Sequence, residues 1–287
     1  MVLPEQDGMR LRDVLRRVMG VSYTAMKSAK WNGGITVDGV VTPVDAFVRA
    51  GQVVAIRFRE NAPAYAVKPY DLPLTIAHED DWLFVIDKPA PLASQSSALH
   101  PDDTLENALY AHLCCPTDFV YRPVNRLDKG TSGLMIVAKD AHIQHRLQAL
   151  LHTPEFIRTY QAVVEGCPDD DCGVIDAPIG KEDAASIRRI VTASGKPSVT
   201  HYRVLKRGKT RALVELTLET GRTHQIRVHM ASIGCPVVGD FLYGTEIPQL
   251  PGRFALHASA LTLHHPMTGD WLSLTSPLPA SLATLLD

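Results

Sequence analysis

Asp128 has the surroundings of a residue that takes part in chemistry. It lies between Arg126 and Lys129 in a polar loop, directly before the apolar run 133–138. That run predicts a buried strand, and a rigid strand fixes the loop that leads into it. The two cations would keep the carboxylate ionised at neutral pH, and an ionised carboxylate can act as a nucleophile or a base. The structural alternative is a loop acid that its neighbours neutralise, with Thr and Ser side chains hydrogen-bonding the turn.

A second group of candidates lies in the segment 222–229, which contains Arg222, His224, Arg227 and His229. The two histidines are five residues apart, whereas two metal ligands on one helix face need a separation of three or four. No metal site is therefore predicted here. The basic side chains either bind a phosphate or a carboxylate, or they form a solvated helix edge.

The helix that carries this group is expected to begin after the cap residue Thr223 and to end at Gly234. Arg227 would lie beside its buried face and could reach a cleft. Three apolar residues share that face: Ile226, Met230 and Ile233.

Tyr160 is the third candidate. It is expected in a strand, on the same face as Ala162 and Val164. A tyrosine in this position is most often part of a core or its rim. It gains a functional meaning if a planar substrate stacks on its ring.

Short strands and a few helices must position these residues from Leu74 onward. The strand candidates are 81–89, 133–140, 159–166, 199–221 (a hairpin turning at 207–209) and 270–277. Within 211–219 apolar and polar side chains alternate, which predicts a half-buried strand. The helix candidates are 103–113, 140–153 with Asp140 as cap, and 223–234. Because strands and helices do not alternate regularly, we expect an α+β fold: a mixed, mostly antiparallel central sheet with flanking helices.

The N-terminal residues predict a small α+β unit. Helical spacing covers 11–20 and 22–33, with Ser22 as cap, and strand patterns cover 34–41 and 51–58. Asp38 and Gly39 form a tight hairpin turn within the first strand pattern. The segment 60–73 contains three prolines and little periodicity, which is typical of a linker. The sequence therefore predicts three regions: a small domain at 1–60, a linker at 61–72 and a large domain at 73–287.

Composition excludes several classes of protein. The chain of 287 residues is 45% hydrophobic and 21% charged, as in a soluble globular protein. It has no apolar run long enough to span a membrane and no signal peptide pattern, so a cytoplasmic location is expected. Its five cysteines include no Cys-x-x-Cys pair, which predicts free thiols and neither disulfides nor a zinc site.

Net charge is uninformative at −2, but the charge is unevenly distributed. Between Lys181 and Arg211 the chain has nine basic residues and only two acidic ones. Such a cluster can contact phosphates, and it can equally be a solvated face.

Three ordered segments closely resemble the RluA-type pseudouridine synthases: NRLDKGTSGL from Asn125, IRTYQAVVEG from Ile157 and TGRTHQIRVHMASIGCPVVGDFLYG from Thr220. The resemblance covers about 71–279, including EDDWLFVIDKPAPL and LHASALTLHHPMTG. It implies an enzyme that isomerises uridines in ribosomal or transfer RNA by breaking the N-glycosidic bond, rotating the base and rejoining it through carbon. This reaction needs no cofactor, and the sequence has no cofactor signature.

The resemblance also implies roles for individual residues. Asp128 matches the essential aspartate of the family and would act on a uridine turned out of its stack. Arg227 would pair with the Asp128 carboxylate, and Tyr160 would stack on the flipped base. The remaining matches are two phosphate contacts, a lysine of the substrate site and an apolar pocket wall: Arg126, Arg222, Lys88 and Leu256.

Two positions depart from the family pattern. Asn125 stands where a histidine is usual, so that any role of the histidine lapses or passes to an amide hydrogen bond. After Lys88 and Pro89 the usual Gly and His are replaced, which could change the pocket entrance or the RNA selected.

The N-terminal unit is similar to the small RNA-binding module of the ribosomal-protein-S-four type. Tyr23, Ala25 and Ala29 replace basic residues of its helix. Four cations remain for phosphate contacts: Arg16, Arg17, Lys27 and Lys30.

Two other functions compete with a pseudouridine synthase. A non-catalytic RNA-binding or ribosome-assembly factor could use the same scaffold. A glycoside hydrolase or nucleosidase usually needs a second carboxylate, and none lies near Asp128 in sequence. The sequence specifies neither the RNA position nor the oligomeric state; RNA is the expected partner, with no membrane, and a monomer is expected.

Overall fold

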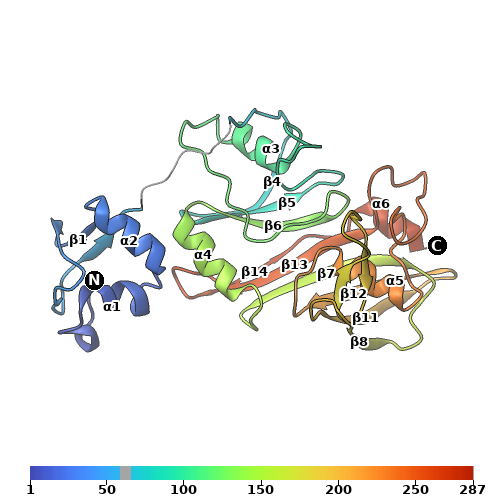
Figure 1. Cartoon of the computed structure of the whole chain (residues 1–287). Coiled ribbons are helices and arrows are strands. Elements are labelled where there is room, and N and C mark those ends of the chain that lie inside the picture. The colour runs from blue at the N-terminus through green and yellow to red at the C-terminus, as the bar shows by residue number, and fades with distance from the viewer. Residues whose placement is uncertain (59–65, 287) are drawn as a thin grey trace.

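A nine-stranded sheet is the centre of the chain in the computed structural model of Figure 1, which describes residues 1–58 and 66–286. In spatial order its strands are β4 (Thr75–Glu79), β5 (Leu83–Lys88), β6 (Ser132–Ala138), β13 (Leu256–His264), β7 (Phe156–Glu165), β12 (Arg211–Leu218), β11 (Val199–Arg207) and β8 (Cys172–Asp176), with β14 (Trp271–Thr275) paired to β13. The pair β6–β13 is parallel, and the other described pairs of this sheet are antiparallel. The predicted mixed, mostly antiparallel sheet is confirmed.

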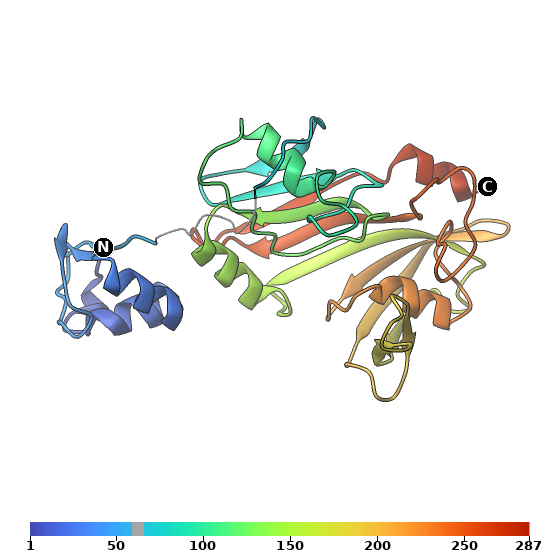
Figure 2. The ribbon, with the colours of Figure 1, turned by 45° about the horizontal axis from the view of Figure 1, so that its top comes forward.

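Helices lie on both faces of the first strands (Figure 2). They are α3 (Leu105–His112) and α4 (Ala141–Leu150). Phe84 and Ile86 of β5 pack in one cluster with Leu105 and Leu109 of α3. The alternate β5 residues, Leu83 and Val85, pack with Ile143 and Leu147 of α4. Because the sheet is covered on both sides, β6 between its neighbours is buried along its whole length and forms a rigid base for the loop before it.

The predicted cap of α4 is confirmed, since the Asp140 side chain accepts a hydrogen bond from Ile143 N at 2.9 Å. The other helix on the first strands, α3, begins at a threonine cap. Thr104 caps α3, with Asn107 completing a capping box. The chain ends with α6 (Ala280–Ala283) and a short 3-10 turn (Thr284–Leu286), which the sequence patterns did not predict.

The helix α5 (Gln225–Ser232) begins differently from the prediction. Thr223 is not its cap: the capping position is His224, which has a positive φ of 59° and makes no capping hydrogen bond. Gln225, the first residue of α5, instead fixes the loop before the helix, since its Oε1 accepts hydrogen bonds from Arg222 N at 2.9 Å and from Thr220 Oγ1 at 2.8 Å. Ile226 and Met230 are buried as expected, but Ile233 is 39% exposed and does not belong to the buried face.

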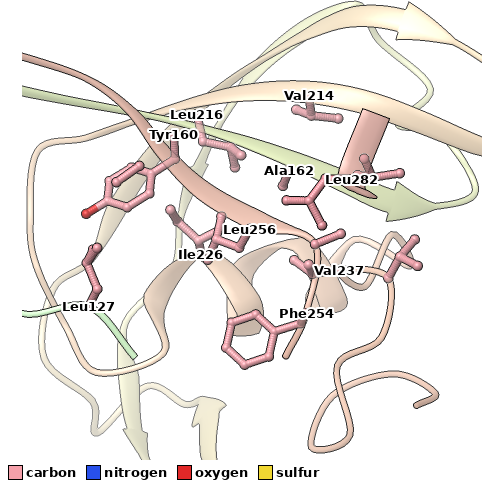
Figure 3. Packing of buried hydrophobic residues seen from close by; sticks show 14 of the residues in the cluster. Leu127, Tyr160, Ala162, Val214, Leu216, Ile226, Val237, Phe254, Leu256 and Leu282 are labelled. Carbon is pink, nitrogen blue, oxygen red and sulfur yellow. The ribbon is translucent and has the colours of Figure 1, made fainter. Parts of the chain in front are cut away.

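The buried face of α5 packs on the middle of the sheet (Figure 3). Ile226 lies among Tyr160 of β7, Leu216 of β12 and Leu256 of β13. In β12 the alternation expected from the sequence is present, with Val214 and Leu216 fully buried. This cluster fixes α5 against the strand that carries Tyr160.

A small hairpin of β9 (Ile179–Lys181) and β10 (Arg189–Val191) lies outside the large sheet. It contains part of the basic segment noted in the sequence. The loop between these strands is held by Asp183, whose side chain accepts hydrogen bonds from the backbone of Ala185 and Ser186.

Residues 1–58 form the expected two-helix unit with a small sheet. Its elements are η1 (Pro4–Gln6), α1 (Leu11–Asp13), which continues as the π-turn η2 (Val14–Val18), α2 (Tyr23–Trp31), β1 (Ile35–Val37), β2 (Val40–Val41) and β3 (Val54–Ile56). Ser22 caps α2 by accepting a hydrogen bond from Ala25 N, and Asp38 and Gly39 turn the hairpin with positive φ, both as predicted. The unit has its own hydrophobic core, centred on Leu11 and Leu15.

Part of the expected linker 61–72 lies outside the described residues. Its described part contacts the large core, because Val67, Tyr70 and Leu72 pack against it. Phe58, at the end of the N-terminal unit, stacks on His142 of α4 with ring centroids 5.3 Å apart. Within 1–58 and 66–286, no helix has the length and apolar character needed to cross a membrane.

Candidate active site

Two adjoining cavities open beside Asp128. The smaller, of about 70 Å³, lies between the Asp128 loop, Tyr160 and the start of α5. The larger, of about 550 Å³, extends from there toward α4 and falls in the usual size range of ligand pockets. Six residues line both: Arg126, Asp128, Tyr160, Leu218, Arg222 and His224. Of the seven residues predicted for the site, all except Lys88 line the smaller cavity.

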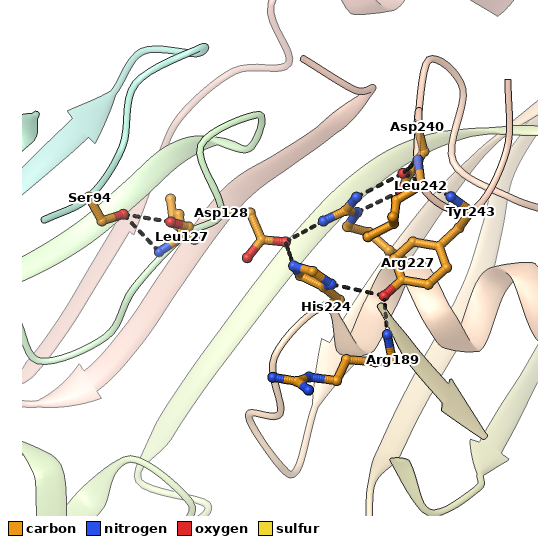
Figure 4. Close-up of polar contacts among 9 residues, drawn as sticks. All are labelled: Ser94, Leu127, Asp128, Arg189, His224, Arg227, Asp240, Leu242 and Tyr243. Carbon is orange, nitrogen blue, oxygen red and sulfur yellow. Dashed lines mark hydrogen bonds and ion pairs between the residues drawn. The ribbon is translucent and has the colours of Figure 1, made fainter. Parts of the chain in front are cut away.

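Asp128 is held by Arg227, as the sequence comparison with the family implied. Arg227 Nη1 donates a hydrogen bond to Asp128 Oδ2 at 3.0 Å (Figure 4). Arg227 is itself fixed by a second carboxylate, because its Nε and Nη2 donate to the two oxygens of Asp240 at 2.6 and 2.8 Å. Asp240 is fully buried and Arg227 is 3% exposed, whereas the Asp128 side chain is 30% exposed. Asp128 is thus the member of the triad that a substrate can reach.

The environment of Arg227 keeps it charged. Burial lowers its pKa, but the hydrogen bonds and charges of Asp240 and Asp128 outweigh burial, and the pKa is raised overall. Its guanidinium lies 4.1 Å from the ring centroid of Phe254 and 5.0 Å from that of Tyr243. These contacts define one position for the guanidinium and so for the carboxylate that it holds.

The backbone around Asp128 is fixed from the opposite side. Ser94 Oγ donates to Leu127 O at 2.6 Å and accepts from Leu127 N at 3.2 Å (Figure 4). Thr131 N donates to Asp128 O and closes the turn. Asn125, the departure from the family pattern, accepts a hydrogen bond from Ile136 N of β6 at 2.9 Å, and so it anchors the loop to the strand.

Tyr160 and Leu256 form the apolar wall. Tyr160 is 6% exposed and Leu256 is 4% exposed, and both line the smaller cavity. Burial raises the pKa of the Tyr160 phenol, with Arg158 opposing and the charge of Asp128 adding to the shift. The phenol is therefore neutral.

His224 extends the polar network on the side of α5. Its Nε2 lies 4.0 Å from Asp128 Oδ2, and its Nδ1 lies 2.8 Å from Tyr243 Oη, which accepts a hydrogen bond from Arg189 N (Figure 4). Burial lowers the pKa of His224, although Asp128 opposes the shift. A neutral His224 can accept a hydrogen bond from Tyr243 Oη at Nδ1, and in that tautomer the proton lies on Nε2, the nitrogen nearer to Asp128.

Arg126 and Arg222 lie at the mouth of the cavities. Arg126 is exposed, and Arg222 donates from Nε to Pro197 O at 3.2 Å. In the part of the chain that the structure describes, neither guanidinium has a carboxylate within ion-pair distance. Both are therefore available to an anionic ligand.

Lys88 lies elsewhere than expected. Its side chain is fully buried, lines neither cavity and donates from Nζ to Leu92 O at 2.7 Å and to Pro89 O at 3.1 Å. Leu92 N in turn donates to Lys129 O, beside Asp128. Lys88 therefore supports the Asp128 loop in this structure, and its predicted contact with a substrate stays a prediction.

Sequence reasoning missed two residues of the site. Asp240 and Tyr243 lie in the quoted segment GDFLYG, but no local pattern marked them as partners of Arg227 and His224. Their only signal was their place in a segment that resembles the family. His224 was noted as a cation, whereas the structure makes it a neutral neighbour of Asp128.

The chemistry of the site rests on one accessible carboxylate. Among the described residues, no group of three or more His, Cys, Asp or Glu side chains could hold a metal ion. Asp128 is the only carboxylate among the residues that line the two cavities. The arrangement suits a nucleophile or base acting on a planar, anionic substrate.

Several known proteins are similar to this chain in sequence or in fold. A family model described as RNA pseudouridylate synthase matches residues 82–232. A ribosomal large subunit pseudouridine synthase D of Pseudomonas aeruginosa is 38% identical over 98% of this chain and 92% of its own length. The protein of the same name in Escherichia coli K12 is 37% identical over 100% of this chain and 92% of its own length. The structure of human RNA pseudouridylate synthase domain containing 1 superposes with a TM-score of 0.61 at 26% identity, covering 73% of this chain and 86% of that one.

Proposed function

Because this chain belongs to the RNA pseudouridylate synthase family, we propose that it isomerises uridines of large-subunit ribosomal RNA to pseudouridine, with Asp128 as the catalytic carboxylate. The observation that supports this most strongly is the contact of Asp128 Oδ2 with Arg227 Nη1 at 3.0 Å, beside the ring of Tyr160. The choice of ribosomal RNA rests on relatives whose names state that substrate.

The reaction conserves atoms. The bond from base N1 to ribose C1′ breaks, the base rotates, and a bond forms from C5 to C1′. The proton on C5 must leave, and N1 gains a proton. Asp128 is the ionised group that can attack C1′ or accept a proton during these steps.

The other residues bind and orient the substrate in this proposal. Tyr160 stacks on the uracil after it has left the RNA stack, and Leu256 closes the pocket behind it. Arg126 and Arg222 contact phosphates at the mouth. Arg227 aims Asp128, and Lys88 supports its loop.

The proposal includes the remaining expectations from the sequence. The unit 1–60 binds RNA through its basic helix residues, the domain from residue 73 carries out the reaction, and the protein acts as a monomer in the cytoplasm. A cavity in the N-terminal unit supports the RNA-binding role, because three of its six lining residues are arginines: Arg12, Asp13, Arg16, Arg17, Tyr23 and Met26.

A map of pseudouridines in cellular RNA tests the function. Cells that lack this protein should lose one or more sites in large-subunit ribosomal RNA, and the purified protein should restore them on RNA from those cells. A map without a lost site, together with no activity on that RNA, would contradict the proposal.

Asp128→Asn separates the enzyme from a non-catalytic RNA-binding factor. We expect pseudouridine formation to fall by more than about a thousandfold, with RNA affinity changed by less than about threefold, because the amide is neutral and a poor nucleophile. Asp171→Asn, an exposed carboxylate paired with Arg207, is the matched control and should keep full activity. If Asp128→Asn retains activity, Asp128 is not the catalytic group.

A further inference from the structure

The larger cavity beside Asp128 carries more positive charge than the proposed reaction requires. Three arginines line it: Arg126, Arg158 and Arg222. Its only carboxylate is Asp128, which is already paired with Arg227. The rest of the lining includes the amide side chains of Gln95, Asn125, Gln144 and Gln148. The cavity therefore suits a ligand that is both anionic and rich in hydrogen-bonding groups.

Arg158 is the cation that most clearly lacks a partner. It is 6% exposed, yet its buried Nε has no hydrogen-bond partner among the described residues, and Nη2 donates to Leu151 O at 3.3 Å. Across residues 1–58 and 66–286, no carboxylate lies within ion-pair distance of it. Burial lowers its pKa, a sign of the cost of holding this charge away from water. A buried guanidinium in this state is stabilised when an anion enters the cavity.

Arg158 lies on the same strand as Tyr160, the residue proposed to stack on the reacting base. Arg158 and Tyr160 are two residues apart on β7, so their side chains lie on the same face, about 7 Å apart along the strand. Gly221 leaves room for the guanidinium, because a Cβ at Gly221 would lie 3.0 Å from Arg158 Nη1. A single nucleotide can therefore place its base on Tyr160 and a neighbouring phosphate on Arg158.

We propose that Arg158 binds an RNA phosphodiester adjacent to the target uridine, and that Arg126 and Arg222 flank this phosphate subsite. The planar guanidinium offers two parallel N–H donors to phosphate oxygens, which a lysine cannot reproduce. The identification of the anion as RNA rests on the proposed function; the need for an anion rests on the burial of Arg158.

The first experiment measures binding of a short uridine homo-oligonucleotide to the full-length protein at several salt concentrations. Arg158→Met should weaken binding by about tenfold and reduce the slope of log affinity against log salt by about 0.7, the value for one phosphate contact on a single strand. Arg158→Lys should retain the slope but only part of the affinity. Arg203→Met is the matched control, because Arg203 is exposed, pairs with Glu215 and lies outside the cavity. An unchanged slope and affinity in Arg158→Met would overturn the subsite.

Thermal unfolding distinguishes ligand binding from a structural role. If Arg158 serves a ligand, replacing this unpaired buried cation by methionine should leave Tm unchanged or raise it. A large fall in Tm, with the salt slope unchanged in the folded fraction of Arg158→Met, would show that Arg158 only holds the chain near Leu151.

A neutral backbone tests the same contact from the side of the RNA. Methylphosphonate linkages in the same oligonucleotide should weaken its binding to the wild type about tenfold more than to Arg158→Met. Equal losses for both proteins would contradict the proposal. The outcome is independent of the enzymatic assay: a wild type that binds in this way but forms no pseudouridine would reject the proposed function and keep the subsite.

Discussion

Arg227 has two carboxylate partners with different tasks. Asp128 is partly exposed and faces the cavities, whereas Asp240 is fully buried and accepts two hydrogen bonds from the guanidinium. Asp240 also accepts hydrogen bonds from Leu242 N and Tyr243 N, which fix it on the loop after α5. If Asp128 is the catalytic group as proposed, Asp240 acts on the reaction only through Arg227, as a positioning residue.

Asp240→Asn should lower kcat by about tenfold to a hundredfold with little change in KM, because the aim of Arg227 on Asp128 is lost while substrate contacts remain. The variant should also be less stable by about 3 kcal/mol, since the buried guanidinium loses the charge of its buried carboxylate partner. Steady-state kinetics below its unfolding temperature and urea unfolding measure the two effects. Asp171→Asn is again the control, and a folded Asp240→Asn with wild-type kcat would rule out the positioning role.

The connection between the Asp128 loop and β6 depends on one glycine, Gly133. Gly133 has a φ of +109° and lies against β13, where an added Cβ would come 2.6 Å from Ala258 N. This close approach allows β6 and β13 to pair in parallel at the end that carries Asp128. The backbone contact between Gly133 of β6 and Ala258 of β13 therefore fixes the position of the loop that carries Asp128.

Gly133→Ala should destabilise the fold by more than about 2 kcal/mol. The free-energy cost of an alanine at this positive φ adds to the cost of the steric overlap with the Ala258 backbone. Gly234→Ala, also at positive φ but with no atom within 4 Å of its Cβ, should cost about 1 kcal/mol. Equal losses of unfolding free energy in the two variants would show that the close approach has no energetic weight.

The stability of the whole molecule should depend on pH through Lys88. Burial lowers the pKa of Lys88 to about 7, with the charge of Asp128 opposing and that of Arg253 adding to the shift. The pKa of an unfolded lysine is about 10.4. Between these values the unfolded chain binds a proton that the folded chain lacks, so the Lys88 contribution to stability rises with pH from about 7 to about 10. Below about 7 both states are protonated, and the folded state bears the full cost of the buried charge.

Lys88→Met removes this dependence. The unfolding free energy of the wild type relative to Lys88→Met should therefore be higher near pH 9 than near pH 6, as urea unfolding at both pH values can measure. Lys68→Met, at an exposed lysine, is the control. A difference that is constant, or that falls as pH rises, would show that Lys88 is charged in the folded protein throughout.

The sequence by itself determined the local features of this protein. Side-chain alternation identified β12, polar residues at the right offsets identified the caps Ser22 and Asp140, and the apolar run after Asp128 identified β6. The ordered segments identified the family and, through it, the pairing of Asp128 with Arg227 across 99 residues. No local pattern predicted the central strand β13, whose small residues carry a weak strand signal.

Only the tertiary structure decided which buried polar groups meet. It assigned Asp240 to Arg227, made His224 instead of Thr223 the capping position of α5, and placed the Lys88 side chain beneath the Asp128 loop and outside both cavities. It also left Arg158 buried with no carboxylate of residues 1–58 and 66–286 within ion-pair distance. The physical reason is that propensity and periodicity act over a few residues, whereas the partner of a buried charge depends on which distant strands and loops the topology brings within hydrogen-bond distance.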